Sequence, residues 1–168
     1  MTIRTILKFP NASLRLPAEP VIEFDDDLKI LAQDLLETMR AAPGIGITAP
    51  HIGVLKRLVV IELGPNSDPG FYVNPEIGQA SGEMSRHMEG SVSMPGVSDE
   101  IERPASVHVR YQDLSGASRT VEAKGLLSVC LQHEIDQLDG KFWIYRLSKL
   151  KRDRLVKRFE KLQRTVKE

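Results

Sequence analysis

The 168-residue sequence contains a single cysteine, Cys130, so no disulfide can form within the chain. A lone thiol is typical of proteins in a reducing compartment, and we expect a cytoplasmic location. Lysine plus arginine and aspartate plus glutamate both number 23, so the formal charge is zero. This balance predicts neither a DNA-binding nor a membrane-binding protein. The sequence also lacks a signal-like opening and any run of about 20 apolar residues, the length that spans a bilayer.

Internal repeats and low-complexity linkers are absent as well, and the length suffices for a proper core, so we predict one domain over residues 1–168. Apolar spacing after the acidic residues 25–27 predicts an amphipathic helix that ends before Pro43. Strands are predicted over residues 56–63, 71–73, 105–113 and 118–124, the last two as a hairpin. The layout is α+β, with antiparallel sheets around one central helix and a further amphipathic helix after Ser148.

The central helix, residues 125–140, is mostly apolar and is closed by Gly140. Its polar residues His133, Glu134 and Gln137 form the pattern H-E-x-x-Q, one residue away from H-E-x-x-H. In the full motif two histidines bind a metal ion, and the glutamate takes a proton from the metal-bound water. An amide oxygen is a poor replacement for imidazole on zinc or iron, so this ligand set is incomplete. The simpler alternative is a buried helix whose histidine is held by a hydrogen bond.

Two further motifs accompany this helix. Residues 44–53 read G-I-G-I-T-A-P-H-I-G, and residues 89–96 read E-G-S-V-S-M-P-G. In this order and at these separations, the three stretches resemble the signature motifs of peptide deformylases, G-x-G-x-A-A-x-Q, E-G-C-L-S and H-E-x-D-H. The resemblance begins at I-L-K-F-P-N-A-S-L-R and ends at Y-R-L-S-K-L-K-R, residues 145–152. It implies the peptide deformylase fold and a hydrolase that removes the formyl group from N-terminal methionine of new polypeptides.

The resemblance also implies a divalent metal, iron or zinc, but two of the three ligand positions are substituted. The family's cysteine corresponds to Ser91 and its second metal-binding histidine to Gln137, which leaves His133. A hydroxyl is far harder to deprotonate than a thiol and is not a soft donor. Substituting a residue that only hydrogen-bonds to a metal ligand typically lowers metal affinity about 10- to 100-fold. Because two ligands themselves are substituted here, we expect weak metal binding or none.

The other site residues are implied in the same way. Glu134 matches the family's general acid/base, and His51 stands where a glutamine helps to hold the reacting carbonyl oxygen. Val92 supplies a backbone N–H to that oxygen, a role that any side chain permits. The implied substrate-binding residues, which include the methionine pocket, are Gly44, Ile45, Gly46, Gly90, Val129 and Cys130.

Three functional hypotheses follow. The first is a degenerate deformylase that keeps its pocket and Glu134 but hydrolyses weakly or not at all. The second is a non-catalytic binder of formyl-methionyl N-termini or of the ribosome. Residues 149–168 contain nine basic and three acidic residues, and in bacterial deformylases a C-terminal helix of this kind docks on the ribosome, where a basic face can meet RNA. The third is a metallohydrolase with a rearranged site of His51, His133 and Glu134.

Simpler interpretations are preferred for four residues. His51 is expected to fill the volume of the glutamine and to donate one hydrogen bond. Cys130 and His133 are not favoured as a ligand pair, because free cysteines are usually buried and inert. A serine hydrolase built on Ser91 is disfavoured, because the chain lacks G-x-S-x-G and adjacent His and Glu side chains on a helix diverge.

Overall fold

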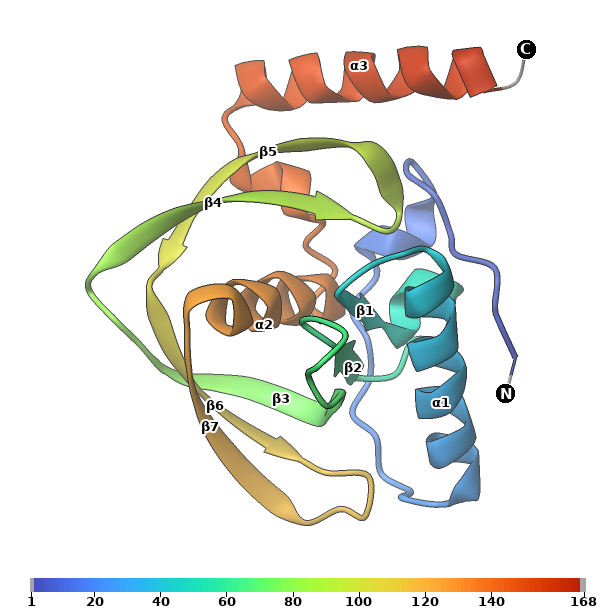
Figure 1. Cartoon of the computed structure of the whole chain (residues 1–168), viewed down its shortest axis with the longest axis vertical. Helices are drawn as coiled ribbons and strands as arrows, with labels where there is room; N and C mark the ends of the chain where they lie inside the picture. Colours follow the sequence, from blue (N-terminus) through green and yellow to red (C-terminus); the bar gives the residue numbers. More distant parts are fainter. Residues whose placement is uncertain (1, 167–168) are drawn as a thin grey trace.

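Helix α2 (Gly125–Leu138) lies at the centre of the fold, between two antiparallel sheets (Figure 1). The structure is a computed structural model that describes residues 2–166. The five-stranded sheet has the order β1 (Gly46–Thr48), β2 (Leu58–Ile61), β3 (Gly70–Ala80), β6 (Ser106–Gln112) and β7 (Ser118–Lys124). The two-stranded sheet pairs β4 (Met84–Ser91) with β5 (Met94–Pro104). The expected α+β fold with antiparallel sheets around a central helix is confirmed.

Helix α2 is the most buried element near the site. Every residue from Ser128 to Leu138 is buried, the polar residues of the H-E-x-x-Q pattern included. Asp139 is the C-cap, and Gly140 follows with a φ of +76°, a conformation that favours glycine. A Cβ atom on Gly140 would also lie 2.6 Å from the carbonyl oxygen of Arg15. The predicted end of the helix at Gly140 is therefore confirmed.

Strand β3 is longer than the sequence pattern predicts. An Asn74-Pro75 pair is typical of a strand end, yet β3 continues through it by means of a register shift between Val73 and Glu76. Asn74 adopts a φ of +50°. Its amide group holds Val21, because the Val21 N–H donates to Oδ1 at 2.7 Å and Nδ2 donates to the Val21 carbonyl at 2.9 Å. The prediction of a strand limited to residues 71–73 is wrong, because the bulge accommodates Pro75 and the strand continues beyond it.

The β4–β5 hairpin is not indicated by the sequence pattern. Its outward positions carry charged residues, while Met94, Val97 and Ile101 are buried in an apolar cluster with α3. The turn of the hairpin contains the second motif, with Ser91 opposite Met94. The strands predicted over residues 56–63 and 105–113 are present with shorter bounds, as β2 and β6. Strand β7 has the predicted bounds, and the β6–β7 hairpin is confirmed.

Two further helices agree with the predictions. Helix α1 (Asp26–Ala41) is capped by Asp25, whose carboxylate accepts the Leu28 N–H at 3.0 Å. Helix α3 (Lys149–Val166) lies across β5 (Figure 1) and buries Leu155 and Phe159. Short 3₁₀ turns complete the chain: η1 (Ala12–Arg15), η2 (Ala49–Ile52) and η3 (Trp143–Arg146). Within residues 2–166, no helix combines the length and the apolar character needed to cross a membrane.

Candidate functional site

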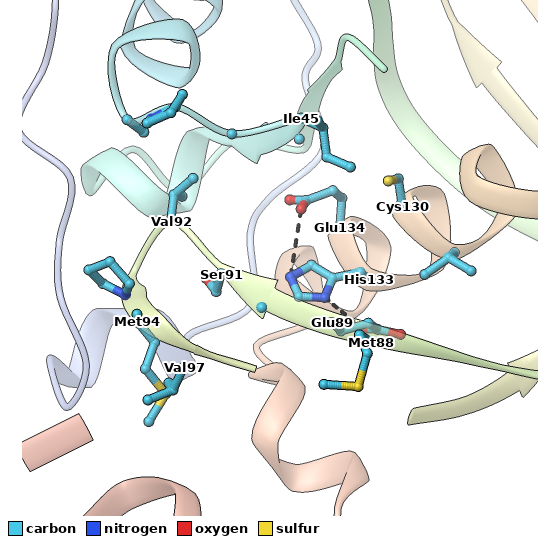
Figure 2. Close-up of a pocket in the computed structure, with 18 of the residues that line it drawn as sticks. Ile45, Met88, Glu89, Ser91, Val92, Met94, Val97, Cys130, His133 and Glu134 are labelled. Atoms are coloured by element: carbon cyan, nitrogen blue, oxygen red, sulfur yellow. Dashed lines mark hydrogen bonds and ion pairs between the residues drawn. The ribbon is translucent and has the colours of Figure 1, made fainter. Parts of the chain in front are cut away.

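A cavity of about 550 Å³ opens between α2, the β4–β5 turn and the segment that leads into β1 (Figure 2). The three sequence motifs meet here, although they are far apart along the chain. Residues predicted for the site that line the cavity are Gly44, Ile45, Gly46, Gly90, Ser91, Val92, Val129, Cys130, His133 and Glu134. His51 and Gln137 are buried but do not belong to its wall.

His133 is held by a buried charged network. Its Nδ1 lies 2.8 Å from Oε1 of Glu89, and because a carboxylate only accepts, the imidazole N–H donates. Arg103 donates two hydrogen bonds to the same carboxylate, at 2.6 and 2.9 Å, and a third to Asp136 at 2.9 Å. Burial raises the pKa of Glu89, but the hydrogen bonds from His133 and Arg103 outweigh it and lower that pKa to about 2. For His133, burial lowers the pKa, whereas the stronger influence of Glu89 and Glu134 raises it. The network fixes the ring and directs Nε2 away from Glu89.

Glu134 is a buried carboxylate that makes no hydrogen bond to any residue from 2 to 166. Its Oε2 has no partner there, and its Oε1 lies 3.7 Å from Nε2 of His133. Burial raises the pKa of Glu134 to about 7, although the charge of His133 partly opposes that rise. The side chain lies against Gly46, where a Cβ atom would approach Oε1 to 3.1 Å. A larger residue at this point of β1 would therefore displace the carboxylate.

His51 lies behind Glu134, within η2. Its Nδ1 is 2.9 Å from the backbone N–H of Thr48, which must donate, so Nδ1 is the acceptor and the ring proton belongs on Nε2. Nε2 is buried and has no hydrogen-bond partner in the part of the chain that the structure describes, and Nδ1 lies 3.9 Å from Oε2 of Glu134. Burial, reinforced by the charge of His133, lowers the pKa of His51 to about 3. The neutral ring thus accepts a hydrogen bond through Nδ1, whereas the sequence predicted that it would donate one.

A family model described as polypeptide deformylase matches residues 3–153 of the chain. The chain belongs to the peptide deformylase family. A peptide deformylase-like protein of Brucella melitensis is 63% identical over 164 residues, which cover 98% of this chain and 100% of that protein. A peptide deformylase of Rhizobium meliloti is 45% identical over 168 residues, covering 98% of this chain and 97% of the relative.

Solved structures of peptide deformylases share the fold. The enzyme from Legionella pneumophila has a TM-score of 0.93 and 40% identity, with 98% of this chain and 97% of that chain covered. The enzyme from Ehrlichia chaffeensis in complex with actinonin has a TM-score of 0.92 and 36% identity, with 98% and 99% covered. The fold of this chain is therefore the peptide deformylase fold over nearly its whole length.

The residues at the deformylase metal positions do not fit a tightly bound metal ion. The Ser91 hydroxyl oxygen accepts the Ser93 N–H at 3.1 Å. Gln137 directs its amide to the N-terminal segment, where Nε2 donates to the Leu14 carbonyl at 2.7 Å. Nε2 of His133 is then the one imidazole nitrogen at these three positions that can bind a metal. Over residues 2–166, no three His, Cys, Asp or Glu side chains gather in a way that could hold a metal ion, which also argues against the rearranged site.

Val92 lies at the β4–β5 turn, between the cavity and the N-terminal segment. Its backbone N–H makes no hydrogen bond with any residue from 2 to 166, whereas its carbonyl accepts one from Nζ of Lys8 at 3.0 Å. The N–H of Phe9 also donates to the Ser93 carbonyl at 2.9 Å, and that of Leu7 donates to the His51 carbonyl at 2.8 Å. Through these hydrogen bonds, residues 7–9 connect the β4–β5 turn to η2.

Several residues of the site are not found by sequence reasoning. Arg103 belongs to no motif. It stands opposite Ser85 in the pairing of β4 with β5, and its side chain reaches both Glu89 on β4 and Asp136 on α2. Lys8 and Met88 line the cavity as well, Lys8 from the N-terminal segment and Met88 from β4. The sequence could have indicated Met88 as a site residue, because it directly precedes the second motif.

Proposed function

We propose that this chain is a peptide deformylase-like protein that binds formyl-methionyl N-termini in the cavity and hydrolyses them weakly or not at all. One observation carries the proposal: a cavity of about 550 Å³ is retained, while the three metal positions offer a single imidazole nitrogen. The residues assigned to the pocket are kept, whereas two of the three metal positions, Ser91 and Gln137, are substituted.

The polar groups of the cavity match a formamide. A formyl group on an amine offers one carbonyl oxygen, which accepts a hydrogen bond, and one N–H, which donates. The Val92 N–H is an unused donor among the described residues, and Glu134 lines the same cavity with a carboxyl group that can accept a hydrogen bond. Val129 and Cys130 add an apolar wall suited to a methionine side chain.

Hydrolysis requires an activated water, and the residues present supply little activation. In metal hydrolases the ion lowers the pKa of water from 15.7 to about 7. Here Glu134, with a pKa of about 7, is the general base that remains. General acid–base catalysis contributes about 10²- to 10⁴-fold, far below the 10⁶-fold or more of most enzymes. Slow turnover or none is the expected result.

Calorimetric titration with formyl-Met-Ala-Ser, with formate assayed in the same samples, tests both halves of the proposal. We expect binding without appreciable formate release. Formyl-Asp-Ala-Ser is the matched control peptide, and it should bind about 10- to 100-fold more weakly, because burying a methionine side chain is worth about 1.5–3 kcal/mol. Equal affinity for the two peptides, or no binding of either, would refute the proposed recognition.

A second candidate partner is the ribosome, reached through α3 in the cytoplasm. The observation that favours it is charge: the basic residues Lys157, Arg158 and Lys161 of α3 are exposed in a chain whose net charge is zero. Co-sedimentation with ribosomes should be lost in Lys157→Glu/Lys161→Glu. It should persist in Arg86→Glu, which reverses an exposed charge on β4. Equal co-sedimentation of the three proteins would contradict a role for α3.

A further inference from the structure

Glu89 and Ser91 lie two residues apart on β4, and their side chains point to the same side of the strand. Exposure alternates along β4, and the less exposed residues are Ser85, His87, Glu89 and Ser91. Glu89 reaches Nδ1 of His133 at 2.8 Å. Figure 2 shows Ser91 on the Nε2 side of that ring and Glu89 on its Nδ1 side. Strand β4 therefore presents a carboxylate and a hydroxyl to the two nitrogens of one imidazole.

The Ser91 hydroxyl has a proton to donate, and His133 has a nitrogen that can accept it. The Ser91 oxygen accepts the Ser93 N–H at 3.1 Å, and its hydrogen goes to no acceptor within residues 2–166. Because Nδ1 of His133 donates to Glu89, Nε2 carries the lone pair. Oε1 of Glu134 is 3.7 Å from Nε2, too far for a hydrogen bond. A hydrogen bond from a serine to its base often forms only when a substrate is bound.

Glu89 is held firmly enough to orient the ring. Arg103 donates two hydrogen bonds to its carboxylate, at 2.6 and 2.9 Å, and both side chains are buried. A serine nucleophile needs a base within reach and a third group that orients the base. The sequence disfavoured Ser91 as a nucleophile because Glu134 cannot orient its neighbour. Glu89 does so instead.

The backbone after Ser91 offers a donor for the oxygen of a substrate. The Val92 N–H makes no hydrogen bond within the described part of the chain, and Val92 lines the same cavity as Ser91 and His133. In enzymes with a serine nucleophile, the N–H of the following residue helps to hold the oxyanion of the tetrahedral intermediate. Removing one donor from such a site slows the reaction about 10²- to 10³-fold. With the single donor that this turn supplies, the site suits esters with a good leaving group better than amides.

We infer that Ser91 is the nucleophile of an esterase site, with His133 as its base and Glu89 as the residue that positions His133. Ser91 Oγ bonds to the acyl carbon of an ester while its proton passes to Nε2 of His133. The bond from that carbon to the alcohol oxygen then breaks, the alcohol takes the proton from Nε2, and the acyl group stays on Ser91. Water, deprotonated by the same nitrogen, releases the acid and restores the serine. This activity goes beyond the proposed function, because it requires neither a metal ion nor a formyl-methionyl N-terminus.

A fluorophosphonate with a small ethoxy group and the ester 4-nitrophenyl acetate test the inference. In the first reaction Ser91 Oγ bonds to phosphorus and fluoride leaves, so mass spectrometry of the digested protein locates the adduct. We expect the adduct on Ser91. We also expect ester hydrolysis that is about 10²-fold or more faster than in Ser91→Ala, the lower end of what a general base contributes.

Two further variants separate the nucleophile from the residue that positions its base. Ser93→Ala is the matched control and should keep both reactions, because Ser93 is buried and does not line the cavity. Glu89→Gln should slow labelling of Ser91 about 10²- to 10⁴-fold per folded molecule, with the folded fraction measured by circular dichroism. A merely structural role of Glu89 would leave that rate unchanged.

Three results would overturn the inference. The first is a natural protein that carries no adduct on Ser91. The second is ester hydrolysis by Ser91→Ala at the rate of the natural protein. The third is an unchanged labelling rate in folded Glu89→Gln, which would show that the pair of Glu89 and His133 does not activate the serine.

Discussion

Glu134→Gln should make the folded chain more stable at alkaline pH. Burial raises the pKa of this carboxyl from its ordinary value of 4.5 to about 7. At about 1.4 kcal/mol for each pH unit, the buried charge costs about 3 kcal/mol of folding free energy above pH 7. The folded state holds the proton more tightly than the unfolded state, so this contribution is present below pH 4.5 and is lost as pH rises through 7. An uncharged amide of the same shape avoids that loss.

The expected gain for Glu134→Gln is about 1–3 kcal/mol at pH 8.5, less than the full amount because the amide still leaves polar atoms unpaired. At pH 5 the two proteins should be nearly equal. The pKa of His133 is also raised, so the stability that protonated His133 contributes is likewise lost as the pH rises. The measured difference between the two proteins therefore includes the interaction of His133 with Glu134. Urea denaturation at pH 5, 7 and 8.5 measures both free energies of unfolding.

Glu89→Gln is the matched control, because Glu89 is also a buried carboxylate but has its pKa lowered to about 2. Its ionised form is the stabilising one, so the substitution should cost about 3 kcal/mol at neutral pH. In the wild type that contribution is lost as pH falls from 4.5 through 2. A Glu134→Gln protein that is less stable than the wild type at every pH would refute the reasoning, because Glu134 would then be a structural residue and not a group kept for function at a cost in stability.

The remaining predictions concern the network and the pocket. Arg103→Ala should lower the free energy of unfolding by about 3–5 kcal/mol, because it leaves the buried Glu89 carboxylate without its guanidinium, whereas Asp136 keeps the one of Arg146; Arg86→Ala, at an exposed pair, should change it by less than about 1 kcal/mol in the same urea titration. Burial raises the pKa of the Cys130 thiol to about 12, so a disulfide reagent at pH 8 should label it only after denaturation, and rapid labelling of the folded chain would contradict this environment. Gln137→Ala should destabilise by about 1–3 kcal/mol by leaving the buried Leu14 carbonyl unpaired, and unchanged stability would show that this contact is dispensable.

Much of the fold could be predicted from local pattern. The amphipathic spacing of α1 and α3, the apolar run of α2 and the glycine after it are local signals, and the structure agrees with each. Strand β3 shows where this reasoning fails. Asn74 and Pro75 indicate an end to the strand, but a distant residue, Val21, satisfies the Asn74 side chain and lets the chain continue through a bulge. Such tertiary contacts leave no local signal.

The candidate site, like the fold, could be predicted from the sequence only in part. The motifs identify His133, Glu134 and Ser91 because their spacing is a pattern within the sequence. They do not indicate that Gln137 bonds to the Leu14 carbonyl, or that the Thr48 N–H sets the tautomer of His51. The contact between Gln137 and Leu14 joins segments 123 residues apart, which only the packing of the whole chain brings together. The contact between Thr48 and His51 spans three residues, and it depends on a 3₁₀ turn that the sequence pattern did not predict. The chemistry of the pocket therefore became clear only with the geometry.

Formate release by the natural protein and by the double variant Ser91→Cys/Gln137→His tests the central claim most directly. Both proteins would be incubated with formyl-Met-Ala-Ser and with iron, zinc, nickel or cobalt under anaerobic conditions, and bound metal would be counted. The account predicts that the double variant binds metal and releases formate, whereas the natural protein retains little metal and releases little or none. Formate release by the natural protein at a rate comparable to the double variant would contradict it.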